Sequence, residues 1–531
     1  MYKQQALAWA VLVTALAAVV VLTAPVASSG SRTVSPTLVR DVKTGVDPLP
    51  PGPTSAGPDP IQDYVQPDTE IEPSVAVNPQ NPKDVVTVFQ DRRIADGGDA
   101  TNAFSTSTDG GKTWKTGTLP GLTTYPGQGG VFERASDAVV AFGPDGTVYA
   151  NSLVFDFNKN QGLRSGIAVN VSKDGGLHWS PPVYLQDDMV GGLNDKNWIV
   201  VDQSDAPGHH KGRVYVVWDR VAPVLYDYCD HDCDQLANWL PDFQTVPGLV
   251  YAGQGIGAYP VVTKNGGLGI VMDAIAGGVP VPSGPDELDA SSDGLVFLAS
   301  PAAGSTPWPA PLPFTPPIHI ASNQSNGTPA QRASDGLPAA AVDQASGTIY
   351  VVWDDGRYRA DGANDAVISR SFDNGVTWTM PQRVNPGSTA NSVNHYNVVV
   401  AVGSSGAVHV AYRQRDQSGK GPLYTDSIDT YYQESIDGGS SWTNPLKVDS
   451  VPSNPWYAAF SRNGTFEGDY NEIASVGGYT YVVRCQGQAK SKSEPPALVA
   501  NPDGSNTLVL TEAGKGHQHQ SAWVALVQDK R

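Results

Sequence analysis

One eight-residue pattern, Ser-x-Asp-x-Gly-x-x-Trp, occurs four times in the chain and constrains its fold more than any other feature. The aspartate and tryptophan of the four copies are Asp109 and Trp114, Asp174 and Trp179, Asp373 and Trp378, and Asp437 and Trp442. In such a segment the aspartate accepts hydrogen bonds from the backbone of a hairpin turn, and the glycine takes a positive φ. The tryptophan is then free to pack between sheets. The pattern predicts four equivalent turns with a structural role.

The spacing of the copies predicts a repeat of about 65 residues. Asp109 and Asp174 are 65 residues apart, Asp373 and Asp437 are 64 apart, and the 199 residues between Asp174 and Asp373 fit three periods. Pairs of apolar strands recur with this period, and we find seven such pairs. The sequence therefore predicts an all-β chain, a β-propeller of four-stranded blades with seven blades favoured and six as the alternative. A β-solenoid is the rival architecture, but its repeats are much shorter.

Composition supports strands and argues against one class of partner. Only 16% of the 531 residues are charged, whereas glycine (56) and proline (43) are plentiful, as in chains with many turns. The formal net charge of −19 argues against nucleic-acid binding. We expect a monomer that acts on or binds a glycan or glycoconjugate, with no cofactor, although acidic loops could bind calcium.

The N-terminal region predicts export. Lys3 precedes an apolar run from Ala6 to about Ala27, which is typical of a signal peptide, and an uncleaved anchor helix is the alternative. We predict a signal peptide or N-terminal anchor over 1–27, a Pro/Gly/Ser-rich linker without a core over 28–68, and the propeller over 69–531. The protein is then secreted, extracellular or on the cell surface, with no other contact to a membrane.

Two of the three cysteines lie close together. Cys229 and Cys233 predict a short disulfide that closes a loop, as expected in an exported protein. A metal site made from both thiols, His231 and nearby carboxylates is the alternative. Cys485 is expected to be a buried apolar side chain on a strand. We otherwise predict no metal site.

The four copies resemble the Asp-boxes of the sialidase superfamily and of BNR-repeat proteins. The resemblance implies a sialidase-like propeller and an exo-sialidase type of glycoside hydrolase. It also implies that the boxes lie on the face away from the active site. The family begins its first inner strand with Arg-Ile-Pro, whose arginine binds the carboxylate of sialic acid. The matching segment here, Glu70-Ile71-Glu72-Pro73, places Glu72 where that arginine would stand, and two carboxylates would repel each other there.

The face opposite the boxes should hold the site, because polar residues mark the beginning of each innermost strand and the end of each second strand. By the resemblance, the general acid/base is Asp96 or Asp99. The nucleophile is Tyr470 with Glu467 or Glu472, or else Tyr396. Carboxylate-binding arginines are Arg92, Arg357 and Arg413. The remaining candidates on this face, which would bind the substrate, are Arg93, Asp137, Asp195, Asp335 and Asp469. The alternative is that these residues only form turns and face water.

Three functions follow from these residues. The first is an exported sialidase-like hydrolase. The second is a non-catalytic propeller that binds carbohydrate or protein at the cell surface, which Glu72 favours. The third is a glycosidase or lyase for a neutral sugar or a different uronate.

Overall fold

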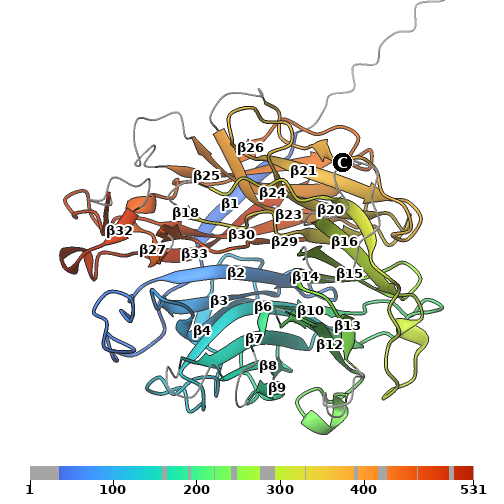
Figure 1. Ribbon diagram of the computed structural model, residues 1–531, viewed down its shortest axis with the longest axis horizontal. Helices are drawn as coiled ribbons and strands as arrows, with labels where there is room; N and C mark the ends of the chain where they lie inside the picture. Colours follow the sequence, from blue (N-terminus) through green and yellow to red (C-terminus); the bar gives the residue numbers. More distant parts are fainter. Residues whose placement is uncertain are drawn as a thin grey trace, which may run out of the picture. The chain divides into compact units, whose positions relative to one another are not determined.

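The computed structural model describes residues 35–157, 164–188, 193–220, 222–240, 248–275, 294–328, 331–387, 393–416, 427–462, 464–500 and 508–529. The predicted signal peptide or anchor at 1–27 lies outside these residues. Within the described part of the chain, no helix is long and apolar enough to cross a membrane. The same part contains no α-helix, and antiparallel strands dominate it (Figure 1).

Successive strands pair into four-stranded antiparallel units. The first two units are β2 (Glu70–Val77), β3 (Val85–Arg93), β4 (Asp99–Ser107) and β5 (Lys115–Thr118), then β6 (Arg134–Phe142), β7 (Val148–Asp156), β8 (Arg164–Ser172) and β9 (Val183–Asp188). One residue pair, Asp99 with Ala135, joins these two units through β4 and β6. The next two are β10 (Asp195–Val201), β11 (Val214–Asp219), β12 (Val224–Cys229) and β13 (Leu249–Tyr251), then β14 (Gly255–Val262), β15 (Leu268–Ala274), β16 (Gly294–Ser300) and β17 (Ile318–Ser322).

The later units follow the same plan. They are β19 (Ala339–Val342), β20 (Ile349–Asp355), β21 (Asp365–Ser371) and β22 (Gln382–Arg383), then β23 (Val393–Val402), β24 (Val408–Asp416), β25 (Ile428–Ser435) and β26 (Leu446–Lys447). The last unit has the order β29 (Glu472–Val476), β30 (Tyr479–Gly487), β33 (Gln520–Gln528) and β1 (Thr37–Lys43). Two smaller sheets consist of β18 (Gln331–Arg332), β28 (Gly464–Phe466) and β27 (Ala459–Ser461), and of β31 (Leu498–Ala500) with β32 (Leu508–Leu510). The described residues also form the 3₁₀ turns η1 (Leu236–Asn238), η3 (Ala303–Ser305), η4 (Pro455–Tyr457) and η5 (Glu512–Gly514).

The first strands of the units contact one another in cyclic order. β2 contacts β6, β6 contacts β10, and the series continues through β14, β19, β23 and β29, which contacts β2 again. Each of these strands also pairs with the second strand of its own unit. The strands β2, β6, β10, β14, β19, β23 and β29 are therefore the innermost strands, and apolar side chains fill the space between neighbouring units.

The four Ser-x-Asp-x-Gly-x-x-Trp segments form the same turn. In the first copy, Asp109 Oδ1 accepts hydrogen bonds from the backbone N–H groups of Lys112 (2.9 Å) and Thr113 (3.0 Å), and Ser107 Oγ accepts one from Gly111 (2.8 Å). The serine–glycine and aspartate–backbone bonds recur in the other three copies. The aspartates thus have a structural role, as the local pattern predicts.

Each of these turns docks on a neighbouring unit. Trp179 packs on Phe104 of the β2–β5 unit with ring centroids 5.7 Å apart, and Trp378 packs on Phe297 of the β14–β17 unit at 5.6 Å. Arg370 on β21 donates a hydrogen bond to the carbonyl of Gly438 in the fourth turn. The turns therefore join consecutive units as well as closing their own hairpins.

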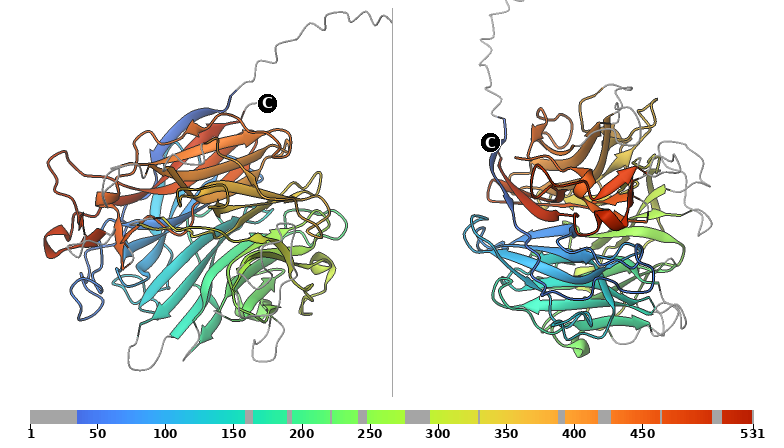
Figure 2. Two further views of the ribbon diagram at one scale, coloured as in Figure 1. Left: turned by 45° about the horizontal axis from the view of Figure 1, so that its top comes forward. Right: turned by 90° about the vertical axis from the view of Figure 1, so that its left-hand side faces the viewer.

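The prediction of a linker without a core over 28–68 is wrong for residues 37–43, which form the strand β1. Thr37–Lys43 pairs antiparallel with β33 as the outermost strand of the last unit, and Figure 2 shows this blue strand beside the red C-terminal strands. Arg40 Nη1 on β1 also donates a hydrogen bond to the carbonyl of Gly110 in the first turn (3.0 Å). The segment has no repeat signal because its partner strand is almost 500 residues away. The N-terminal strand and the C-terminal strands therefore share one sheet.

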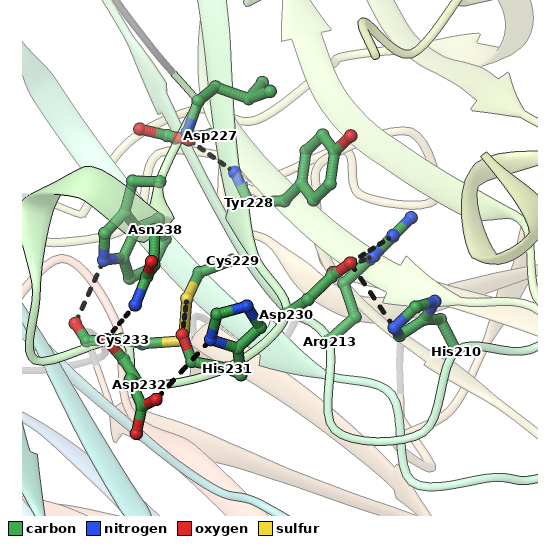
Figure 3. The surroundings of a disulfide bond; sticks show 12 residues. His210, Arg213, Asp227, Tyr228, Cys229, Asp230, His231, Asp232, Cys233 and Asn238 are labelled. Carbon is green, nitrogen blue, oxygen red and sulfur yellow. Dashed lines mark hydrogen bonds and ion pairs between the residues drawn. A yellow bond between two sulfur atoms is a disulfide. The ribbon is translucent and has the colours of Figure 1, made fainter. Parts of the chain in front are cut away.

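Cys229 and Cys233 form a disulfide at the end of β12 (Figure 3). Asp230 accepts hydrogen bonds from Arg213 Nε (2.6 Å) and Nη2 (2.8 Å) in the same view. Because both sulfurs are bonded to each other, the alternative metal site at these thiols is excluded. Cys485 is fully buried on β30, against Phe89 and two alanines.

Substitution of Asp41 tests the role of β1. Arg484 on β30 pairs with Asp41 Oδ1 (2.7 Å) and with Asp449 Oδ1 (2.7 Å), and all three side chains are at most 1% exposed. In Asp41→Asn the carboxylate of Asp449 still compensates the charge of Arg484, but the buried hydrogen bond between two charged groups is lost, so the free energy of unfolding should fall by about 2 kcal/mol. Urea unfolding measures this loss. The control Asp205→Asn, at a side chain that is 83% exposed, should change it by less than about 0.5 kcal/mol. Equal stability of wild type and Asp41→Asn would show that β1 contributes little.

Candidate functional site

A β-bulge recurs near the beginning of most innermost strands. The pairing register shifts after Ile71 in β2, Ser136 in β6, Asp195 in β10, Ile256 in β14 and Tyr396 in β23. The residues that follow these five positions all have positive φ: Glu72 (50°), Asp137 (48°), Lys196 (39°), Gly257 (73°) and Asn397 (49°). A left-handed backbone costs a residue other than glycine about 1–2 kcal/mol. Bulges re-aim side chains, and strained polar residues at one end of adjacent strands indicate a site.

Three of the innermost strands line one cavity of about 170 Å³. Its polar wall contains Glu72, Asp137 and Asp195, together with Arg93 and Arg332. Its apolar wall contains Leu153, Phe155, Phe157 and Leu193. We call this cavity and its polar residues the mouth. It combines an apolar surface with a few convergent charged groups, as small-molecule sites do.

Arg332 is the mouth residue that sequence reasoning missed. It lies on β18, a two-residue strand that runs parallel to β28 and is inserted between two repeat units. Its Nε donates a hydrogen bond to Asp469 Oδ1 (3.0 Å), and its guanidinium lies 4.3 Å from the ring centroid of Phe466. Since its strand pairs with residues more than 130 positions later, no local pattern could have indicated its place.

Arg93 lies on the other side of the same network. Its guanidinium lies 4.8 Å from the ring centroid of Phe466, and its Nη1 is 3.4 Å from Asp99 Oδ2. The Phe466 ring therefore positions both Arg93 and Arg332. The sequence-predicted residues Arg93, Asp137 and Asp195 all line the mouth, and Asp469 adjoins it through Arg332. Asp335 also has a positive φ (48°) and is exposed.

Burial and like charges raise the pKa of the acids in the mouth. Burial, and then the neighbouring Asp137 carboxylate, raise the pKa of Asp195 to about 7. Burial, with Asp137 and Asp469 nearby, raises the pKa of Glu72 well above its ordinary value. Burial also raises the pKa of Asp137, against the opposing effect of the Lys196 ammonium. Near neutral pH the mouth therefore contains protonated carboxyl groups, which can donate hydrogen bonds or protons.

Aromatic side chains of the innermost strands and their flanks pack on one another beside the mouth. Trp198 packs on Tyr259 with centroids 4.6 Å apart and on Tyr470 at 5.2 Å. Lys196 Nζ lies 3.7 Å from the centroid of Tyr470 and 4.2 Å from that of Trp198. Beyond this aromatic layer, a second cavity of about 440 Å³ has mainly apolar walls and includes Glu472. The mouth and this second cavity are therefore on opposite sides of the layer.

The predicted acid/base candidates occupy structural ion pairs. Asp96 Oδ1 lies 2.5 Å from Arg134 Nη1, and the Arg134 guanidinium lies over the Phe157 ring. Asp99 pairs with Arg93, and burial raises its pKa to about 7. Both residues lie in the loop and strand beside the mouth, but neither lines it; of their two partners, Arg93 lines the mouth and Arg134 does not.

The predicted tyrosine–glutamate nucleophile is not formed by Tyr470. Glu467 instead pairs with Arg413 and accepts a hydrogen bond from Ser453, and Glu472 accepts hydrogen bonds from Ser74 and from the Val75 N–H. Tyr470 is buried under Lys196, and burial followed by nearby carboxylates raises its pKa well above the ordinary value. A tyrosine with a raised pKa is a poor nucleophile.

Tyr396 lies near Glu467 in a different cluster. Its hydroxyl hydrogen-bonds with the Gln331 side chain at 3.0–3.2 Å, and Arg413 and Glu467 act on it electrostatically. Tyr396 is 1% exposed, Arg413 1% and Glu467 2%. Burial raises the pKa of Tyr396 to about 12. The cluster is thus closed to a ligand.

The three predicted carboxylate-binding arginines each pair with a different carboxylate of the protein. Arg92 pairs with Asp47 (2.9 Å), Arg357 with Asp355 (2.9 Å), and Arg413 with Glu467. Arg92 also donates to the carbonyls of Pro50 and Leu49. These guanidinium groups therefore hold loops and strands together. The cations that line the mouth are Arg93 and Arg332, and Lys196 acts electrostatically on Asp137.

Comparison with known proteins leaves the family open. No protein-family model matches the chain, and no curated protein matches it. A protein of unknown function from Dyadobacter fermentans is 14% identical with a TM-score of 0.42, over 93% of this chain and 100% of that one. Penicillium chrysogenum alpha-L-arabinanase complexed with arabinobiose is 11% identical with a TM-score of 0.41, over 93% and 99%. The intramolecular trans-sialidase from Ruminococcus gnavus is 12% identical with a TM-score of 0.40, over 66% and 90%. Since every TM-score lies below 0.5, these likenesses assign neither a fold family nor an activity.

The raised pKa of Asp195 predicts a pH dependence of stability. An aspartate in an unfolded chain has a pKa of about 3.9, so between about pH 4 and pH 7 the folded state binds more protons than the unfolded state. The free energy of unfolding should therefore fall as the pH rises through this window. In Asp195→Asn, which cannot ionise, this fall should shrink by roughly 1–3 kcal/mol. Urea unfolding between pH 4.5 and pH 8 measures it.

The exposed control Asp205→Asn should keep the wild-type pH profile. If Asp195→Asn keeps it as well, the carboxyl group of Asp195 titrates as it would in water, and the electrostatic account of the mouth is wrong.

Proposed function

We propose that the chain is a seven-bladed propeller and that the mouth is a glycoside hydrolase site that uses carboxyl groups as acid and base. The cyclic contacts of the seven innermost strands support the blade count. The observation that supports the activity is the convergence of Glu72, Asp137 and Asp195 in one cavity, where their pKa values are raised.

Asp195 and Asp137 have complementary properties for this reaction. Asp195, with a pKa of about 7, can protonate the leaving oxygen as the glycosidic C–O bond breaks. Lys196 and Arg332 both favour the charged form of Asp137, with Lys196 having the larger effect. Asp137 can activate a water, or attack the anomeric carbon itself, and water completes the hydrolysis. Glu72 accepts a hydrogen bond from the Asp469 N–H (3.0 Å) and can contact a sugar hydroxyl.

The charges of the mouth favour a neutral sugar over a sialoside. A sialoside carboxylate needs arginines that are available to it, whereas Arg332 pairs with Asp469 and Arg93 with Asp99. Protonated carboxyl groups hydrogen-bond well to sugar hydroxyls, and the apolar wall can contact a sugar ring. The alternative substrate is a sialoside, in which case the enzyme is an exo-sialidase.

A second function, glycan or protein binding without turnover, is supported by one observation. The tyrosine–glutamate pair that the family resemblance implies is absent from the mouth, because Glu467 pairs with Arg413. A binding propeller needs only the mouth's hydrogen-bonding groups and its apolar wall.

We also propose that the protein is exported, on the apolar run from Ala6 to about Ala27. Expression of the full chain in a secreting host, followed by fractionation and sequencing of the mature N-terminus, tests this. Cleavage near residue 27 or retention in a membrane fraction would both support export, and uncleaved protein in the cytosol would contradict it.

Activity should depend on the two acids of the mouth. On aryl glycosides of neutral sugars, wild-type kcat/KM should fall above about pH 7 as Asp195 loses its proton. Asp195→Asn and Asp137→Asn should each lower kcat by about 10²–10⁴-fold, because each removes a proton-transfer group or nucleophile. Steady-state assays over pH 4–9 measure both effects.

The substrate panel separates the candidate functions. Asp205→Asn should keep wild-type kcat. Turnover of a fluorogenic sialoside, lost in Asp195→Asn, would replace the neutral-sugar proposal with the sialidase form. If no glycoside is turned over but a glycan array shows binding that Asp137→Asn abolishes, the mouth is a binding site and hydrolysis is excluded.

A further inference from the structure

Three potential metal ligands lie together where β24 begins and β25 ends, at the end of the β23–β26 unit that is opposite the beginning of β23. His409 on β24 and Glu434 on β25 are direct cross-strand partners, so their side chains lie side by side on one face of the sheet. Asp529 directly follows β33 of the last unit. The ligand atoms of His409, Glu434 and Asp529 lie within 4.8 Å of one another. The cluster therefore connects two neighbouring units.

The hydrogen bond of the His409 side chain leaves the lone pair of its Nε2 nitrogen available to a metal ion. Tyr432 donates its hydroxyl hydrogen to Asp529 Oδ1 (3.4 Å), so its oxygen is free to accept the proton of His409 Nδ1, 2.6 Å away. In that tautomer Nε2 carries no hydrogen. Metal-binding histidines commonly donate their second N–H in this way, which fixes the ring orientation.

His409 Nε2 is aimed into the cluster. The side chain is fully buried, Nε2 makes no hydrogen bond in the described structure, and it lies 3.8 Å from Asp529 Oδ2. A buried imidazole nitrogen without a partner costs free energy unless something else binds it. A water or a metal ion in the cluster would satisfy it.

The backbone leaves space beside this nitrogen. A Cβ on Gly403 would lie 2.8 Å from His409 Nε2 and 3.1 Å from Ser475 Oγ, so the glycine keeps that volume open. A cavity of about 290 Å³ reaches Gly403, Glu434 and Asp529 and gives solvent access to the cluster. A metal–imidazole bond of about 2.0–2.1 Å needs such a space next to Nε2.

We propose that His409, Glu434 and Asp529 bind a divalent transition-metal ion, with zinc as the best fit. One imidazole nitrogen and two carboxylates match the nitrogen and oxygen ligands of zinc, and a water from the cavity can occupy the fourth position. Calcium and magnesium prefer sites made of oxygen alone. The ion would also compensate the charge of the two carboxylates.

This metal site would be structural. Gly403 follows the end of β23, whereas Asn397, the bulge residue that corresponds to Glu72 and Asp137, lies near its beginning, so the ion is remote from the strand ends that hold the proposed acids. It joins β24 and β25 to the end of β33, in the sheet that also holds the N-terminal strand β1. The proposal is independent of the activity of the mouth.

Zinc binding to the full chain tests the proposal. The protein is treated with EDTA, exchanged into chelator-free buffer, and mixed with zinc chloride. Bound metal is measured by mass spectrometry after gel filtration, and Tm by calorimetry. Wild type should retain about one zinc per chain, and Tm should rise by about 2–3 °C when free zinc is 100-fold above Kd.

Two variants and a control make the result specific. His409→Gln and Asp529→Asn should each lose zinc retention and the rise in Tm. The control His178→Gln removes an exposed imidazole that pairs with Asp174, and it should behave as wild type. If His409→Gln does not fold, Asp529→Asn alone decides.

Three results would overturn the proposal. They are no zinc retained by wild type, zinc retained equally by Asp529→Asn, or a rise in Tm with calcium but not with zinc. The first would mean that a buried water satisfies His409 Nε2.

Discussion

Each four-stranded unit has two apolar faces, and covering both is the constraint on which the rest of the structure depends. Neighbouring units cover them, and the repeated turns fix the contact, as when Trp378 packs on Phe297. Cyclic stacking aligns the beginnings of the innermost strands. Polar residues at the beginnings of β2, β6 and β10 are thereby brought to one mouth, although they are more than 50 residues apart in the sequence.

Local patterns predict the parts of this structure whose interactions are local. The turn around Asp109 is made by residues within four positions of it, so its hydrogen bonds can be inferred from eight letters. The strand-start residues Asp137 and Asp195 follow from the repeat period in the same way. β1 and Arg332 could not be predicted, because each depends on a partner strand far away in the sequence, and neither belongs to the repeat.

The arginines also show that interactions between residues far apart in the sequence are hard to predict. Arg357 pairs with Asp355 two residues earlier, which the sequence alone could have suggested. Arg92 and Arg413 pair with Asp47 and Glu467, which lie 45 and 54 residues away. An exposed-looking arginine at a strand end is therefore weak evidence for a ligand site in a protein rich in aspartate, because a carboxylate of the chain itself can occupy it.

The charge at Glu72 is better understood from the whole mouth than from its own strand. Glu72 replaces the arginine that the family resemblance implies, yet Arg332 brings a guanidinium to the same cavity from β18. That guanidinium already binds Asp469, so it offsets the acidity of the mouth without providing a free anion site. Burial then keeps Glu72 protonated near neutral pH and Asp195 protonated below about pH 7. Protonated acids beside a neutralised arginine suit uncharged hydroxyl groups, and this is the physical reason to expect a neutral sugar in the mouth.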